Sequence, residues 1–339
     1  MEVKGERKKY NAIDLTKFIM AIFVIAVHTY PLVGINNTIV LDVYKSIVYI
    51  AVPFFFIVSS YFLFIKVNKF DEDKGKEIIT SYIKKMIKLY IIWNIIFLPM
   101  AIYEYNKEGY SLIKSVMFYI RGFLLVGEHY YSWPLWYLLS TIYSTIFLLV
   151  LKKKNIKEKN ILIISTVIFI LACIMNYLSD NISKLEGINY NIAFLINLTF
   201  SSGRIFTGIF YMAIGMYFSN HKENLPKSVL IILFIFALIF SSYYYNDVCE
   251  AIMGITIFLI VRDIDLKDKE MYYFLRKSST IMYFMHMIFF FIYSLFVGFD
   301  VAKGLDGFFV SLVSCMIFSV IIQAIQNKYN FTFFKEIFG

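Results

Sequence analysis

The sequence predicts an all-α integral membrane protein, a bundle of about ten transmembrane helices with the N-terminus and the C-terminus in the cytoplasm. Hydrophobic residues make up 60% of the chain, and its mean hydropathy is +0.68, whereas a soluble domain is about 45–50% apolar. A soluble core of that size would leave too little polar surface to cover it. The apolar residues also fall into long runs separated by short basic blocks, as expected when lipid is the solvent.

The runs predict ten spans, because a bilayer core of roughly 30 Å needs about 20 apolar residues per helix. An eleventh apolar stretch, 110–127, carries Lys114 and Arg121. Because charges are costly in lipid, we expect a re-entrant or interfacial helix there, within a long outer loop at 104–132. One transmembrane domain is expected over 1–339, with a cytoplasmic tail at 1–11. The predicted spans are 12–34, 40–65, 79–103, 133–151, 160–178, 197–218, 228–245, 249–262, 279–298 and 306–326.

The basic residues predict the orientation, because cytoplasmic loops of membrane proteins carry an excess of Lys and Arg. With the N-terminus inside, 25 of the 33 basic side chains fall on the cytoplasmic side and six on the outer side. Lys17 and Arg204 remain within spans. The net charge of +9 therefore indicates topology and lipid headgroups. No nucleic acid is expected as a partner, because the sequence has no basic stripe and no zinc or helix-turn-helix spacing.

The first span holds the densest set of ionisable residues, each of which is costly in lipid and hence a candidate functional residue. Lys17 and His28 are eleven residues apart, which returns a helix to within about 20° of the same face, about 16 Å further along. Asp14 lies three residues before Lys17, at pairing distance on that side. Lys17 can also simply snorkel to the cytoplasmic interface. His28 is too deep for that, but it can also serve only as a hydrogen bond between helices.

The ninth span carries a second candidate polar face. Ser279, Tyr283 and His286 follow one another at i, i+4 and i+7, so they share one side of a helix. His286 falls near the middle of the membrane. As in the first span, a hydrogen bond between helices is the structural alternative to a functional role.

The sixth span places Arg204 in its outer half, where a guanidinium needs an anionic or carbonyl partner. Glu128 and His129 lie just before the fourth span at the same predicted level, but we expect them to be solvated loop residues. Gly208 and Gly215 are expected to be sites of close helix packing.

The sequence contains no Gly-rich phosphate loop, no cluster with metal-ligand spacing and no GxSxG nucleophile motif. We therefore expect no bound metal or cofactor. Cys173, Cys249 and Cys315 lie within or beside apolar runs, which predicts buried thiols rather than a disulfide framework.

With these residues in view, the chain resembles acyltransferase family 3 of membrane proteins over nearly its whole length. The family opens with an Asp, an Arg or Lys, and a His ten intervening residues later, as do Asp14, Lys17 and His28. The family's commoner Arg is Lys17 here, which keeps the charge and loses the bidentate fork, and the Gly of its SGY segment is Ser60. The further segments that resemble the family are PFFFIVSSYFLF (53–64), KKMIKLY (84–90), PLWYL (134–138) and STIMYFMH (279–286).

The resemblance implies transfer of an acyl group, usually acetyl, from cytoplasmic acyl-CoA to a hydroxyl of a sugar or cell-envelope glycan. The implied location is the cell membrane, in a bacterium the cytoplasmic membrane. A cation near the cytoplasm would hold the CoA, and a neutral imidazole further out would act as general base. Arg204, Tyr283 or His286 would donate to the developing oxyanion. The candidate catalytic residues are His28, His286 and Tyr283, and the candidate binding residues for acyl-CoA or the other substrate are Asp14, Lys17, Arg204 and Ser279.

Two other readings stay open. The first helix and the segment AVPFFFIVSSYF also look similar to the membrane half of the serine racemases of vancomycin-resistance clusters, for which the family suggests binding or uptake of an amino acid. A polysaccharide-export partner without its own chemistry is the weaker reading. The sequence leaves open the acceptor, the oligomeric state, whether a cytoplasmic domain follows, and whether the first, sixth and ninth spans share one cavity.

Overall fold

The computed structural model describes residues 10–222, 225–243, 246–329 and 332–338, and 10 and 11 are the described residues of the predicted cytoplasmic tail. In these ranges the structure is helical, with turns and no strand. The chain divides into two compact units that interleave along the sequence. The first contains 1–51, 225–245 and 252–331, and the second contains 52–224, 246–251 and 332–339.

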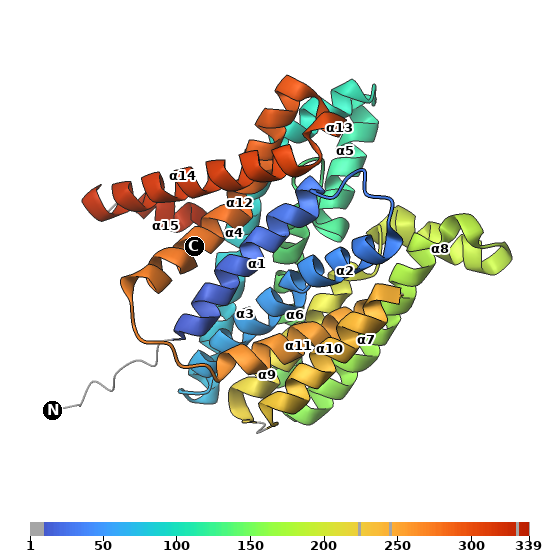
Figure 1. Ribbon diagram of the computed structural model, residues 1–339. Coiled ribbons are helices and arrows are strands. Elements are labelled where there is room, and N and C mark those ends of the chain that lie inside the picture. Colours follow the sequence, from blue (N-terminus) through green and yellow to red (C-terminus); the bar gives the residue numbers. More distant parts are fainter. Residues whose placement is uncertain (1–9, 223–224, 244–245, 330–331, 339) are drawn as a thin grey trace. The chain divides into compact units, whose positions relative to one another are not determined.

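The first unit is built around two long helices that lie side by side, α1 and α12. Helix α1 packs against α12, α2 and α14, α12 also packs against α14, and α10 packs against α2 (Figure 1). The helices of this unit are α1 (Asn11–Thr29), α2 (Thr38–Tyr49), α10 (Lys227–Tyr243), α12 (Glu270–Val297), α13 (Phe299–Ala302), α14 (Leu305–Tyr329) and most of α11 (Asp247–Arg262).

The second unit centres on α6, which packs against α4 and α9, while α7 packs against α9 and α8, and α15 returns to α4. Its helices are α3 (Ala51–Val67), α4 (Glu72–Lys107), α5 (Leu112–Arg121), α6 (Trp136–Lys153), α7 (Glu158–Asp180), α8 (Gly187–Phe200), α9 (Arg204–Asn220) and α15 (Thr332–Phe338). Three short turns of other helix types complete it, at Gly122–Val126, Trp133–Leu135 and Ile182–Lys184.

A multi-pass membrane protein follows from the length and hydropathy of these helices. Seven segments of the described residues are long and apolar enough to cross a membrane, or eight if α8 and α9 count as one bent span. Helices α10 and α11, with 17 and 16 residues, are shorter than that measure requires. A helix therefore overlaps each of the ten predicted ranges, while the count of ten spans and the placement of the termini stay predictions.

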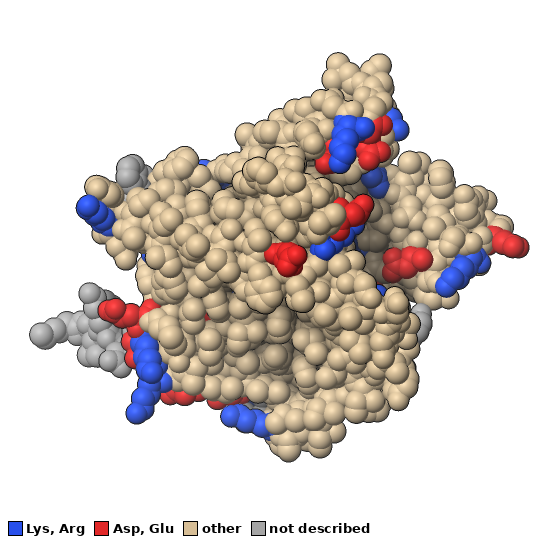
Figure 2. Space-filling model, turned by 45° about the horizontal axis from the view of Figure 1, so that its top comes forward, with Lys and Arg blue, Asp and Glu red and all other residues tan. Residues whose placement is uncertain are grey.

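The surface supports the same conclusion. Figure 2 shows Lys, Arg, Asp and Glu gathered in a few groups on one face, with broad areas between them that carry none. Exposed apolar side chains recur along α14 at helical spacing, including Phe309, Val313, Ile317 and Val320. A soluble monomer does not leave so much large apolar surface uncovered, so these faces are suited to lipid.

The sixth predicted span is not a single straight helix. Helices α8 and α9 meet at a 74° bend, and Ser201 at the break has a left-handed φ of 66°. The short polar run Ser201, Ser202, Gly203 lets the chain turn there, because serine side chains compete with helical hydrogen bonds and glycine adds freedom. Arg204 consequently begins α9 instead of lying inside a continuous helix.

Close packing within the second unit agrees with the glycine prediction. A Cβ on Gly208 would collide with Ser140 and Phe56, and one on Gly215 would collide with the backbone carbonyl of Ile57. Ser60, the departure from the family's SGY segment, is fully buried and donates to the carbonyl of Met212 at 2.5 Å. This hydrogen bond therefore links α3 to α9. The three cysteines are free, two of them buried.

Candidate functional site

The polar faces predicted on the first and ninth spans meet in the first unit. Helix α1 is continuous through Lys17 and His28, as the spacing argument requires. The imidazole of His28 stacks on that of His286 from α12, with ring centroids 5.4 Å apart and planes 30° from parallel. The two histidines that the sequence placed on separate helices therefore form one pair.

His286 is the deeper member of this pair and is completely buried. Its Nδ1 lies 2.9 Å from the carbonyl oxygen of Met282, one turn earlier on α12. Since a carbonyl can only accept, Nδ1 carries the proton, and in the neutral ring the lone pair is on Nε2. Nε2 is buried and has no hydrogen-bond partner among the described residues. The neutral ring can therefore accept a hydrogen bond or a proton at Nε2.

The remaining predicted residues of α12 lie on the same side of the helix. Ser279 is buried and donates to the carbonyl of Arg276 at 2.8 Å, within its own helix. Tyr283 is half-buried, and its ring meets Phe284 edge to face.

A second cation, Arg276 of α12, lies near the N-terminal end of α1. Asp14 is buried, and its carboxylate lies 3.5 Å from the guanidinium of Arg276 on α12. Lys17 is one turn from Asp14 on α1 and is half-buried. Asn11 fixes this end by donating to the carbonyl of Leu266 at 3.0 Å. Both Lys17 and Arg276 therefore neighbour the same carboxylate.

The sequence did not single out Arg276, because this residue falls just before the predicted ninth span and was one of the 25 basic residues assigned to the cytoplasmic side. A signal was present. Arg276, Ser279, Tyr283 and His286 continue one stripe at i, i+3, i+7 and i+10, which is one face of a helix.

Arg204 lies in the second unit, and Glu128 is the anionic partner that the sequence analysis expected for it. Its guanidinium forms an ion pair with Glu128 and sits 5.2 Å from the centroid of the Trp136 ring. The expectation that Glu128 and His129 are solvated is wrong: the Glu128 side chain is 19% exposed and His129 is 7% exposed.

The 127–132 loop is folded inward by its own hydrogen bonds, which explains that error. The backbone N–H of His129 donates to the hydroxyl of Ser132 at 2.8 Å. The His129 ring stacks flat on Tyr119, 4.1 Å away, and its Nδ1 lies 3.3 Å from the hydroxyl of Tyr105. Burial lowers the pKa of His129 to about 4, so this ring is neutral at physiological pH.

No group of three or more His, Cys, Asp or Glu side chains in the described ranges could hold a metal ion. The polar groups on α1 and α12 suit proton transfer by imidazole at one end and binding of an anion by Lys17 and Arg276 at the other.

Comparison with known families decides the classification. A family model described as an acyltransferase domain matches residues 10–324. The chain belongs to acyltransferase family 3. This membership covers nearly all of the described chain, including both polar faces, and it agrees with the resemblance seen in Asp14, Lys17 and His28. No solved structure matches the chain.

The curated proteins that are similar to this chain are named as racemases. Two proteins of Enterococcus faecalis, each named amino-acid racemase, are 24% identical over 69% of this chain and 23% identical over 82% of it. A serine/alanine racemase of Enterococcus gallinarum is 29% identical over 37%. The matches cover 32%, 37% and 18% of those proteins, so the chain spans about a third or less of the relatives that it matches.

Proposed function

We propose that this membrane domain transfers an acyl group from cytoplasmic acyl-CoA to a hydroxyl of a cell-envelope sugar or glycan at the bacterial cytoplasmic membrane. The observation that carries the proposal is the His28–His286 pair, with ring centroids 5.4 Å apart. Lys17 lies on the same helix as His28, about 16 Å away along its axis. Family membership supports acyl transfer, and this geometry supports the assignment of roles.

In the proposed reaction His28 is the general base. Its neutral imidazole removes the proton of the acceptor hydroxyl as the oxygen attacks the thioester carbonyl of acyl-CoA. The tetrahedral intermediate then collapses to the ester and expels the CoA thiolate, which takes up the proton that His28 removed from the acceptor, so that the imidazole returns to its neutral form. A positioned base of this kind contributes about 10²- to 10⁴-fold in rate.

The other end of α1 is suited to the donor. Lys17 and Arg276 bring two positive charges to one carboxylate, that of Asp14, so the group as a whole is positive. The phosphates of CoA favour such a place, because hydrogen bonds between charged partners are about twice as strong as neutral ones. Lys17 and Arg276 therefore bind the anionic part of CoA, and Asp14 holds them in position.

The hydrogen bond of His286 to Met282 bears on which residue stabilises the oxyanion. Because neutral His286 presents a lone pair at Nε2, it is better placed to accept a proton or orient His28 than to donate to an oxyanion. Tyr283, one turn earlier with a hydroxyl, is then the donor on this face. Ser279 remains a candidate contact to substrate. Arg204, which is paired with Glu128 in the second unit, is not assigned a role at this site.

The names of the relatives favour a second candidate function. A membrane domain within an amino-acid racemase could bind serine or carry it inward, and the same polar groups could bind its charged ends. Uptake needs no general base, which separates the two proposals experimentally.

The test is a reconstitution of the full chain in proteoliposomes, with two assays side by side: consumption of acetyl-CoA with acylation of a glycan extract, and accumulation of radiolabelled serine. We expect acetyl-CoA consumption that His28→Ala slows by about 10²- to 10⁴-fold. His221→Ala is the matched control, because His221 is an exposed histidine at the end of α9. Serine accumulation without acylation, or full activity of His28→Ala, would contradict the proposal.

A further inference from the structure

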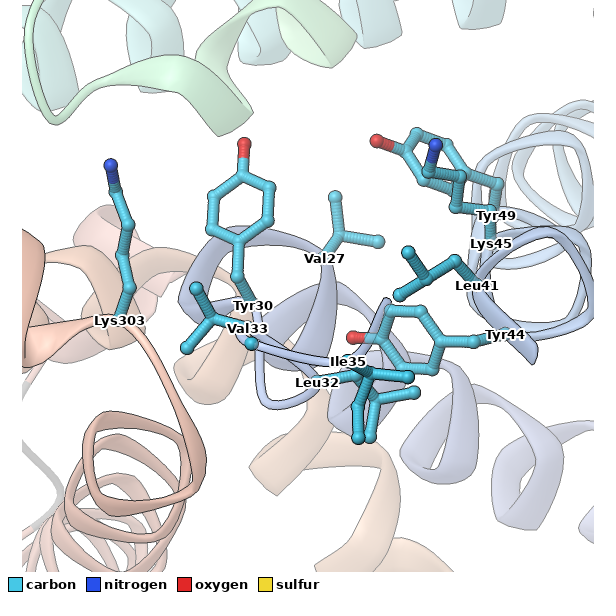
Figure 3. Close-up of a pocket in the computed structure, with 11 residues that line it drawn as sticks. Val27, Tyr30, Leu32, Val33, Ile35, Leu41, Tyr44, Lys45, Tyr49 and Lys303 are labelled. Atoms are coloured by element: carbon cyan, nitrogen blue, oxygen red, sulfur yellow. The ribbon is translucent and has the colours of Figure 1, made fainter. Parts of the chain in front are cut away.

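The first unit contains a cavity of about 320 Å³ at the end of α1 that is opposite to Lys17. Its walls come from the last turn of α1, the segment 30–35 that follows, helix α2, and Lys303 just before α14 (Figure 3). This volume is at the lower end of the range for small-molecule sites. It is enough for one headgroup with a short length of chain.

The inner wall of the cavity is hydrocarbon, while its rim is cationic. Figure 3 shows the ammonium groups of Lys45 and Lys303 and the hydroxyl of Tyr30 directed to the same side, away from the aliphatic side chains. Those aliphatic side chains are Val27, Leu32, Val33, Ile35 and Leu41. The arrangement matches a molecule with an anionic head and an apolar chain.

The two lysines are able to accept such a head. No carboxylate of the described residues pairs with Lys45, which is exposed. Lys303 pairs at 3.0 Å with Asp300, whose side chain is 91% exposed. The Lys303 side chain itself is 26% exposed, and its ammonium lies 4.2 Å from the centroid of the Phe299 ring. Ion pairs with a solvent-exposed partner contribute little, so an anion can displace Asp300. In Figure 3 the two lysines lie on opposite sides of Tyr30 and Val27, so each can bind an anion at its own edge of the cavity.

The walls of the cavity are held by hydrogen bonds within the first unit. The hydroxyl of Tyr44 on α2 donates to the carbonyl of Ala26 at 2.8 Å. The N–H of Gly304 donates to the carbonyl of Thr29, also at 2.8 Å. Tyr30 ends α1 in a left-handed conformation, with φ at 51°. Such a site is pre-organised, and less ordering is needed when the ligand binds.

We infer that this cavity binds a phosphate carried on a single hydrocarbon chain, and that this is how a lipid-linked acceptor is held beside His28. The inference rests on the proposed function. Val27 and Tyr30 line the cavity, and His28 lies between them in the last turn of α1. Helix α1 is 19 residues long, or about 28 Å, so Lys17 and the cavity lie at opposite ends of it. Donor and acceptor would then approach from opposite faces of the membrane.

A single chain is favoured over a diacyl phospholipid by the size of the cavity. At about 320 Å³ the cavity is at the lower end of the range for small-molecule sites. It takes a head with the first part of one chain, and the rest of a longer chain such as farnesyl lies outside it in the bilayer. A bulk phospholipid with the same phosphate is therefore an outcome that the test must separate.

The test uses the full chain in phosphatidylcholine nanodiscs and a photoreactive farnesyl phosphate as the probe. We expect a cross-link to the α1–α2 segment that unlabelled farnesyl phosphate displaces, while farnesol and phosphatidylglycerol at the same concentration do not. The double variant Lys45→Gln/Lys303→Gln should bind at least tenfold more weakly. Lys45→Arg/Lys303→Arg should restore binding, and Lys114→Gln, an exposed lysine of α5, should leave it unchanged.

Displacement by farnesol as strong as by farnesyl phosphate would overturn the phosphate site. Equal displacement by phosphatidylglycerol would overturn the single-chain assignment, and unaltered binding by the double glutamine variant would overturn the role of the lysines. The cross-link needs no chemistry, so His28→Ala should keep it while losing transfer. Cross-linking in a wild-type protein that shows no acyl transfer would refute the proposed function and the acceptor role, and leave a lipid-phosphate site.

Discussion

Acidification from pH 7.5 to pH 5 should destabilise the protein through His129. Burial lowers the pKa of this residue to about 4, against about 6.5 in an unfolded chain. Between those values the unfolded state binds the extra proton, so stability is complete above pH 6.5 and falls as the pH drops towards 4. At about 1.4 kcal/mol per pH unit, the loss at pH 5 is about 2 kcal/mol. The rings that contact His129, Tyr105 and Tyr119, stay neutral throughout this range.

The assay is equilibrium unfolding by sodium dodecyl sulfate in dodecyl maltoside micelles, followed by circular dichroism at both pH values. His129→Gln has no titrating side chain, so it isolates the contribution of this residue from those of the carboxylates. Wild type should lose about 2 kcal/mol more than His129→Gln on acidification. An equal loss in the two proteins would refute the burial of His129.

Two further predictions use the same unfolding assay. Gly215→Ala should lower the free energy of unfolding by about 1–3 kcal/mol, because the added methyl group collides with the fixed backbone carbonyl of Ile57. Gly75→Ala is the control, because its methyl group is tight only against a side-chain methyl of Val67, at 3.1 Å, and makes ordinary contact with the backbone of that residue. Equal effects would contradict the packing described. Glu128→Gln should lower the free energy of unfolding by about 1–3 kcal/mol, which is less than for a fully buried pair because the Arg204 side chain is 32% exposed. Glu108→Gln, at an exposed position, is the control and should have little effect. An unchanged free energy of unfolding for Glu128→Gln would show that the ion pair contributes nothing to stability.

Helical periodicity was sufficient to predict those features that depend on the spacing of residues within one helix. The alignment of Lys17 with His28, the stripe on α12 and the packing glycines of α9 all follow from 3.6 residues per turn. Apolar content likewise predicted a multi-pass membrane protein. These features are local, so one sequence was enough to predict them.

Features that depend on distant residues were not predictable in that way. Asp14 meets Arg276 across 262 positions, and nothing in either segment alone indicates the pair. The inward fold of His129 depends on the hydrogen bond that its backbone N–H donates to Ser132, which looks like an ordinary loop serine. The bend before Arg204 did have a local signal, the run Ser201–Gly203, but a single glycine is also common within membrane helices.

The central claim is that His28 and His286 act as one unit in acyl transfer, and a double-mutant cycle on kcat/KM tests it most directly. His286→Phe keeps the ring volume and removes both nitrogens, while His28→Ala removes the general base. If the residues act together, the double variant will be no slower than His28→Ala alone. Strictly additive losses, or an unaltered rate for His286→Phe, would contradict the account.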